Sequence, residues 1–157
     1  MKYAKGLPLA LEVLGSFLGT CESMDEWKSA LEKLKKYPEK DITKILQISF
    51  DALDEPEKNI FLDIACFFNG SPKDYIMKTM DACGFFPEIG IQSLVDKSLL
   101  HMDHNGFHDT LRMHDLLEEM GKEIVRKESR NEPGRRSRIW SYKDLCHVMN
   151  NDTVSGC

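Results

Sequence analysis

The spacing of apolar residues predicts helices throughout the first third of the chain. A heavily apolar run over residues 9–18 follows Pro8, and proline suits the first turn of a helix because its missing N–H would be unpaired there. Apolar residues within 27–34 recur at i, i+3, i+4 and i+7, which predicts an amphipathic helix that ends near Pro38. The apolar positions between 42 and 53 share one helical face and predict a third helix.

The clearest helix start in the chain is at Asp54. Aspartate is a good N-cap residue, a proline follows in the first turn, and Glu57 stands three residues after the cap, as in a capping box. The run Ile60–Phe68 that follows is apolar on nearly all sides, which predicts the central buried helix. Within this run we expect Cys66 to be a small core residue and Asp63 to make a structural hydrogen bond.

Two short helices, over about 73–82 and 87–97, should follow before the pattern changes. Short apolar runs then flank Asn105-Gly106, a dipeptide that favours tight hairpin turns. A last short helix is expected over about 142–149. Several helices followed by a hairpin predict a mainly α protein, with a helical-bundle piece followed by a winged-helix domain that has a small β-hairpin.

Charge is distributed unevenly along the 157 residues, whose formal net charge is -5. Residues 41–121 hold 6 Lys or Arg against 15 Asp or Glu, net -9, whereas residues 122–143 hold 8 against 3, net +5. The stretch Glu132–Arg138 is interpreted as a basic surface loop. Because nucleic-acid binding depends on neutralising phosphates, the acidic balance disfavours it.

Compartment and metal binding can be addressed from the cysteines and histidines. Five cysteines are an odd number without a C-x-x-C pair, which favours a reduced compartment and a cytoplasmic or nuclear location. Glu12 interrupts the N-terminal apolar stretch and no cleavage site follows, so we infer no signal peptide. No run approaches the roughly 20 apolar residues of a membrane span.

The histidines from His101 to His114 lack Cys or carboxylate partners at ligand spacing, so no metal site is expected.

Four sequence blocks, in order, resemble one known family. Gly6-Leu7-Pro8-Leu9-Ala10 resembles the GLPLA motif of the NB-ARC module in plant nucleotide-binding, leucine-rich-repeat resistance proteins. Phe61–Phe68 resembles the FLDIACFF block of the subclass that has an N-terminal TIR domain. Met113-His114-Asp115 matches the MHD motif, and Arg136–Trp140 resembles the segment that leads towards the repeats. The resemblance covers essentially the whole chain.

The resemblance implies a domain organisation and a function. Residues 1–38 would be the C-terminal part of the first ARC subdomain, 41–130 the second ARC subdomain with its winged helix, and 131–157 a linker towards the leucine-rich repeats. In this family ADP lies between the nucleotide-binding core and these subdomains and holds the protein inactive. Exchange for ATP permits homo-oligomerisation and defence signalling. The expected partners are therefore the core and repeats of the same protein.

The resemblance implies nucleotide-binding roles for two residues. Pro8 matches the proline that packs beside the adenine and ribose, and His114 matches the histidine that contacts the β-phosphate of ADP. Asp115, with Glu118 three residues on, predicts a second capping box, which places His114 before a helix N-terminus where free N–H groups favour an anion. Without the resemblance, Pro8 would be a helix-start proline and His114 a loop histidine. Met113 is expected in the core.

Some motifs of a complete nucleotide-binding enzyme are absent from the sequence. There is no GxxxxGK[ST] phosphate loop, and no apolar strand ends in paired acids that could hold Mg²⁺. We therefore expect a fragment of a longer protein, without ATP hydrolysis and without tight binding of ADP or ATP by itself.

Two other functions remain open at this point. The first is a winged-helix nucleic-acid binder, although the candidate recognition helix Ile89–Lys97 carries only Lys97 as a cation. The second is a structural adaptor or partner-binding module, which would leave the coincidence of four family motifs unexplained.

Overall fold

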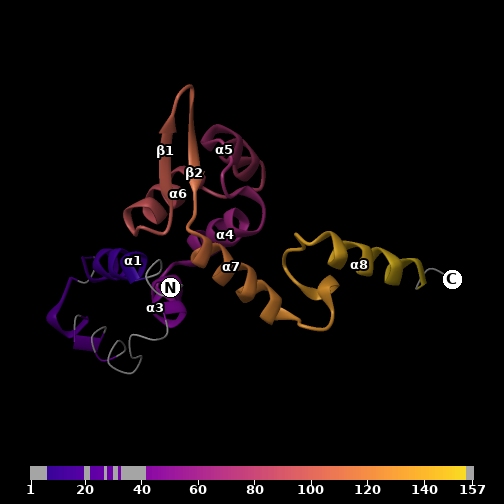
Figure 1. The fold of residues 1–157 in the computed structure, drawn as a ribbon, viewed down its shortest axis with the longest axis horizontal. Helices are drawn as coiled ribbons and strands as arrows, with labels where there is room; N and C mark the ends of the chain where they lie inside the picture. Colours follow the sequence, from indigo (N-terminus) through magenta and orange to yellow (C-terminus); the bar gives the residue numbers. More distant parts are fainter. Residues whose placement is uncertain (1–6, 20–21, 27, 30–31, 33–41, 155–157) are drawn as a thin grey trace.

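The computed structural model describes residues 7–19, 22–26, 28–29, 32 and 42–154 of the chain. The described part is mainly helical and contains one two-stranded antiparallel sheet (Figure 1). The elements in chain order are α1 (Leu7–Gly19), α3 (Ile42–Asp51), α4 (Glu55–Asp63), η2 (Ile64–Phe68), α5 (Lys73–Ala82), α6 (Pro87–Asp96), β1 (His101–Asn105), β2 (His108–Arg112), α7 (Asp115–Glu128), η3 (Pro133–Arg135) and α8 (Tyr142–Val154).

The first and third predicted helices are confirmed as α1 and α3, which pack against each other. Leu9 and Val13 of α1 are buried in the same apolar cluster as Leu46 of α3. The Ser16 hydroxyl lies 2.7 Å from that of Ser98, which follows α6. The residues on which the second helix was predicted, and its expected end, lie outside the described residues: Trp27, Ala30, Leu31, Leu34 and Pro38.

The helix start at Asp54 has the predicted capping box. Asp54 Oδ1 accepts a 2.8 Å hydrogen bond from the Glu57 N–H, and Glu57 Oε2 accepts one of 3.1 Å from the Asp54 N–H. The Glu57 carboxylate also accepts from Lys97 Nζ at 2.9 Å and from the Ser93 hydroxyl. Burial raises the pKa of Glu57, but the hydrogen bonds from Ser93, Lys97 and Asp54 and the Lys97 charge bring it below its ordinary value. One carboxylate thus caps α4 and joins it to α6.

The central buried helix is also present, but its last turn differs from the prediction. It is α-helical only to Asp63, and Ile64–Phe68 form a π-helix, η2. A run that is apolar on all sides has no polar face to mark its turns, so its pattern cannot distinguish an α-helix from a π-helix. Cys66 is buried as predicted, and this burial raises the pKa of its thiol to about 11.

The hairpin forms one step later in the sequence than the Asn-Gly pattern suggested. β1 and β2 pair from His101 with Arg112 to Asn105 with His108, so Gly106 and Phe107 make the turn. Gly106 has φ +84°, which glycine adopts without strain. Residues 70–72 run along the other side of β2: the Gly70 N–H bonds the Leu111 carbonyl at 2.9 Å, and the Leu111 N–H bonds the Ser71 carbonyl at 3.1 Å.

α7 crosses η2 at very close range. A Cβ at Gly121 would lie 2.6 Å from the Ala65 Cβ and 3.2 Å from Phe61 Cε1. Glycine is therefore required at this contact, which brings the middle of α7 against the central buried helix.

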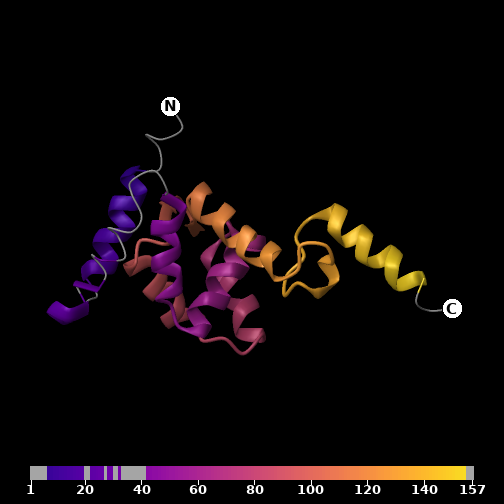
Figure 2. The ribbon, with the colours of Figure 1, turned by 90° about the horizontal axis from the view of Figure 1, so that it is seen from below.

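The chain after α7 leaves the helical body. η3 and α8 follow, and α8 extends away from the other helices on the side opposite α1 (Figure 2). α8 ends at Val154 and is longer than the predicted helix over 142–149. Within the described residues, none of the helices combines the length and the apolar character needed to cross a bilayer.

Candidate functional site

His114 occupies the junction between the end of the hairpin and the start of α7. Its φ of -63° and ψ of 145° are extended, and its Nδ1 accepts a 3.1 Å hydrogen bond from the Leu116 N–H. The His114 carbonyl accepts from the Leu117 N–H at 2.9 Å and from the Glu118 N–H at 3.0 Å. His114 is therefore the N-cap of α7.

The predicted second capping box at Asp115 is wrong. Asp115 is the first helical residue and is exposed, while the cap is supplied by the histidine before it. The Glu118 carboxylate does not return to the cap backbone, because it accepts from the Asn69 amide and from Lys122. A D-x-x-E spacing that starts one residue inside the helix resembles a capping box in sequence without forming one.

The cap bond fixes which nitrogen of His114 can act on a ligand. Because Nδ1 accepts a hydrogen bond, the proton of the neutral ring is on Nε2. The residue is only partly buried, so its second nitrogen is the group that remains for an outside acceptor. The arrangement offers one N–H donor held in place by the backbone of α7.

The helix N-terminus itself offers less to an anion than expected. The N–H groups of Leu116, Leu117 and Glu118 all bond to His114. Asp115 and Glu118 also place carboxylates in the first turn, where they favour the helix dipole and oppose a second anion. The predicted anion preference therefore rests on the imidazole rather than on free backbone N–H groups.

Asn69 holds the residue that precedes His114. Its Oδ1 accepts from the Met113 N–H at 2.8 Å, and its Nδ2 donates to the Met113 carbonyl at 3.2 Å. Met113 is buried in the core, as predicted. Sequence analysis missed Asn69, whose only signal is a polar amide directly between the apolar block and Gly70.

Glu118 supports the same turn from α7. It accepts from Asn69 Nδ2 and from Lys122 Nζ. Burial raises the pKa of Glu118, but the hydrogen bonds from Lys122 and Asn69, together with the Lys122 charge, lower it by more. The net pKa is below its ordinary value. The carboxylate is therefore ionised at neutral pH and keeps the Asn69 amide oriented.

The prediction that Glu132–Arg138 forms a basic surface loop is wrong for two of its three arginines, Arg136 and Arg138. The Arg138 side chain is only 10% exposed: its Nε donates to Asp63 at 2.5 Å, and its Nη2 donates to the Asn59 carbonyl at 3.2 Å. The structural hydrogen bond predicted for Asp63 is thus present. Arg135 alone is exposed, at 78%. Composition gives the charge of a segment but not the position of its partners.

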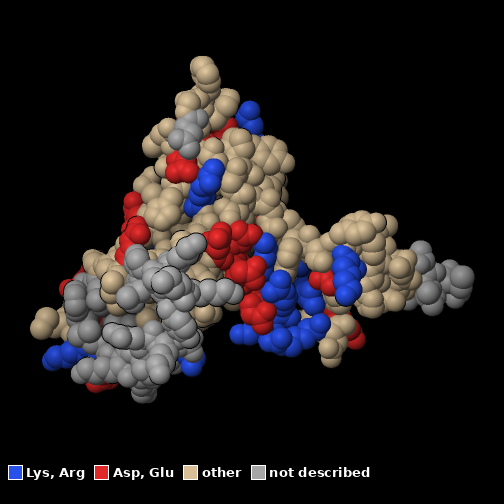
Figure 3. All heavy atoms as spheres, viewed as in Figure 1, with Lys and Arg blue, Asp and Glu red and all other residues tan. Residues whose placement is uncertain are grey.

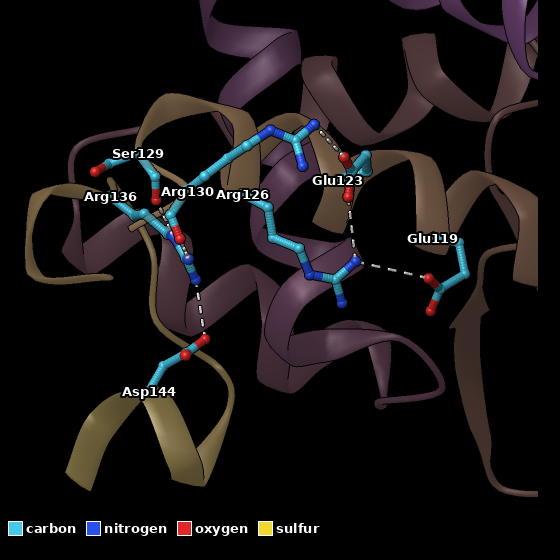
Figure 4. A network of polar contacts seen from close by, with 7 residues as sticks. All are labelled: Glu119, Glu123, Arg126, Ser129, Arg130, Arg136 and Asp144. Carbon is cyan, nitrogen blue, oxygen red and sulfur yellow. Dashed lines mark hydrogen bonds and ion pairs between the residues drawn. The ribbon is translucent and has the colours of Figure 1, made fainter. Parts of the chain in front are cut away.

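Arg136 joins the end of α7 to the start of α8 (Figure 4). It donates to the Ser129 carbonyl at 2.7 Å, to the Arg130 carbonyl at 3.1 Å and to Asp144 at 2.9 Å. Acidic atoms lie over the first half of α7, and basic atoms lie over its end and the segment beyond (Figure 3). This order complements the helix dipole.

α6, the candidate recognition helix, offers little to a phosphate backbone. Lys97, at the C-terminal end of α6, is bound to Glu57. The open pocket beside α6 is lined by Glu88 and Asp96 as well as Lys73. Because Arg136 and Arg138 are also engaged in internal bonds, the described surface gives the nucleic-acid alternative no support. A steep salt-dependent affinity for duplex DNA would reverse this conclusion.

The GLPLA block is only partly described. Gly6 lies outside the described residues, and Leu7 and Pro8 belong to α1 but their side chains lie outside the described part. Leu9 is buried. The nucleotide role of Pro8 therefore stays a prediction. Among the described residues, no three His, Cys, Asp or Glu side chains are grouped so that they could hold a metal ion.

A comparison with known proteins supports this fold. The family model described as "Disease resistance protein Roq1-like, winged-helix domain" matches residues 54–129. Residues 54–129 of the chain belong to this winged-helix family of disease resistance proteins. The matched region contains the hairpin, Asn69 with its two bonds to Met113, and the whole of α7. The predicted winged-helix fold and the resemblance to plant resistance proteins are confirmed.

Similarity to individual resistance proteins extends beyond the winged-helix domain. The chain is 47% identical to disease resistance protein RUN1 of Vitis rotundifolia over 91% of its own length and 10% of that protein. It is 43% identical to TMV resistance protein N of Nicotiana glutinosa, over 98% of the chain and 13% of that protein. The chain thus spans about a tenth of the length of these curated relatives. The proposed division at residues 38–41 and 130–131 stays a prediction.

Proposed function

We propose that the chain is the C-terminal part of an ADP/ATP-dependent switch in plant immune signalling, in which His114 contacts the nucleotide phosphate. The observation that carries the proposal is the N-cap geometry of His114. Its Nδ1 is committed to the Leu116 N–H, so Nε2 is left as a fixed hydrogen-bond donor. A phosphate oxygen is a suitable acceptor for that donor.

In this proposal His114 connects nucleotide state to the position of the winged helix. A ligand shifts a two-state equilibrium only through a difference in its affinity for the two states. The bound nucleotide would supply an anionic oxygen in one arrangement of the domains only. His114 then stabilises that arrangement, and Pro8 would pack beside the base. Hydrolysis is not assigned to this chain, because the phosphate loop would belong to the rest of the protein.

The test separates the capping role of His114 from its proposed phosphate contact. Serine is a good N-cap but is too short to replace the imidazole donor, whereas alanine loses both functions. In a complete resistance protein that contains this chain, we expect His114→Ser and His114→Ala to release ADP about tenfold faster, the effect of one charge-assisted hydrogen bond. Both variants should also signal without a pathogen.

His108 is the matched control, because it is an exposed histidine at the start of β2, at the hairpin tip and away from His114. His108→Ala should retain ADP at the wild-type rate. If His114→Ser keeps its ADP and stays inactive, the phosphate contact is wrong. If only His114→Ala releases ADP, the residue acts through the helix cap alone.

A further inference from the structure

Asn69 lies where the central buried helix ends and the chain turns towards the sheet. It follows the π-helix η2 directly, and Gly70, with φ +80°, redirects the chain so that residues 70–72 pair with β2. The end of η2 is thereby brought beside the end of the hairpin, 44 residues later in the chain. Asn69 is the side chain that bridges these two segments.

The bridge is made to the backbone of a single residue. The Asn69 amide accepts from the Met113 N–H at 2.8 Å and donates to the Met113 carbonyl at 3.2 Å. A primary amide presents a donor and an acceptor side by side, so it can replace the two backbone bonds that a neighbouring strand would make. Both peptide planes around Met113 are therefore fixed by one side chain.

Fixing Met113 also fixes His114. The carbonyl of Met113 belongs to the peptide bond whose nitrogen is that of His114, so the Asn69 bond orients the backbone on which the imidazole stands. The imidazole is then held from its other side by the Leu116 N–H. Glu118 keeps the amide in this orientation by accepting from Nδ2.

We propose that Asn69 is a positioning residue of the His114 site: it clamps the Met113 backbone and thereby sets the direction of the His114 Nε2–H. This inference rests on the proposed function of His114. Asn69 does not itself contact the nucleotide in this scheme. Its effect on a ligand is exerted only through the orientation of the histidine.

The first experiment measures the geometry of His114 in this chain by NMR. We compare Asn69→Ala with the wild type, using the two imidazole ¹⁵N shifts of His114 and the exchange rate of the Leu116 amide. Loss of the two hydrogen bonds to Met113 and of the one to Glu118 should accelerate exchange of that amide at least about tenfold. In a fixed tautomer the two imidazole ¹⁵N shifts are well separated. Loss of the cap bond should bring the two shifts closer to each other.

Asn59→Ala is the matched control for a purely structural effect. Asn59 is another partly buried asparagine of the same helical stretch, but its amide bonds to the Glu55 carbonyl and to Arg138. It should lower stability while leaving the His114 shifts unchanged. If Asn69→Ala proves unfolded, Glu118→Gln provides a milder version, with a smaller change in the same direction.

The outcomes distinguish this inference from the proposed function. Unchanged His114 shifts in a folded Asn69→Ala chain would overturn the positioning role. In a complete resistance protein, Asn69→Ala should release ADP faster, and Asn59→Ala should not. If the shifts move but neither Asn69→Ala nor His114→Ser changes ADP release, Asn69 still positions His114, and the nucleotide role of His114 is wrong.

Discussion

The two ends of α7 are joined to the rest of the domain by different kinds of interaction. At its start, the turn that contains Met113 and His114 (the His114 turn) is held by the neutral amide of Asn69 and by backbone bonds. At its end, residues 129–141 are held by two guanidinium groups, those of Arg136 and Arg138, which are 7% and 10% exposed. Both segments are short and irregular, so their positions depend on these side chains.

The difference lies in what each kind of bond requires. A neutral amide loses little on burial when both its donor and its acceptor are paired. A buried guanidinium must have its charge compensated and most of its N–H groups bonded, because desolvation of a charge is expensive. Arg138 meets this requirement with Asp63, Asn59 and the Ser137 hydroxyl. The segment that follows α7 should therefore tolerate the loss of one partner poorly.

The largest effect is expected from Arg138→Met. The substitution leaves the Asp63 carboxylate partly buried without its cation, and we expect the free energy of unfolding to fall by about 3 kcal/mol, measured by urea denaturation. Adding Asp63→Leu should recover most of that loss, because the pair is then replaced by apolar contacts.

Arg135→Met is the control for Arg138→Met. Arg135 is 78% exposed and pairs with Glu132 three residues earlier, so its replacement should change stability by less than about 0.5 kcal/mol. Equal losses in the two variants would mean that burial of the guanidinium does not determine how strongly this segment is held.

A smaller effect is expected at Gly121, where the middle of α7 packs against η2. Gly121→Ala would place a methyl group 2.6 Å from the Ala65 Cβ, which forces α7 and η2 apart. We expect a loss of about 2 kcal/mol in thermal unfolding. Because η2 lies between Asp63 and Asn69, the amide protection of both the His114 turn and residues 129–141 should fall together.

Gly15→Ala serves as its control. Gly15 is inside α1, and among the described residues no atom outside the backbone of α1 lies within 4 Å of a Cβ built there. The same substitution should there increase stability by about 0.5–1 kcal/mol. Loss of protection at only one end of α7 in Gly121→Ala would show that the two segments are supported separately.

The elements that sequence predicted well are those whose signal is local. The capping box at Asp54 and Glu57 involves residues three apart, and the structure contains both of its bonds. The same spacing at Asp115 misled, because His114 took the cap and Glu118 had a better partner in Asn69, far away in sequence. Local patterns succeed where no distant residue competes for the same groups.

The parts of the site that sequence did not predict depend on distant pairs. His114 was found through its motif, but Asn69 has no motif, and its partner is 44 residues away. Arg138 was assigned to a surface loop because its partner, Asp63, lies 75 residues earlier. A single sequence contains the chemistry of both partners but nothing that states their proximity.

The smallest effect is expected at Glu118, the carboxylate that bonds to Asn69 beside His114. The pKa of Glu118 is held below its ordinary value of 4.5, since the bonds from Lys122 and Asn69 outweigh the opposing effect of burial. A lowered carboxylate pKa adds stability that is complete above the unfolded value and is lost as the pH falls through the folded value. Glu118→Gln should therefore cost about 1 kcal/mol at pH 7, and the difference from wild type should shrink as the pH falls below 4.5 and vanish below the folded pKa of Glu118. Glu119→Gln, 66% exposed and 3.9 Å from Arg126, should show a smaller difference at pH 7. A Glu118→Gln deficit that persisted unchanged into acid would mean that the turn depends on the shape of the side chain and not on its charge.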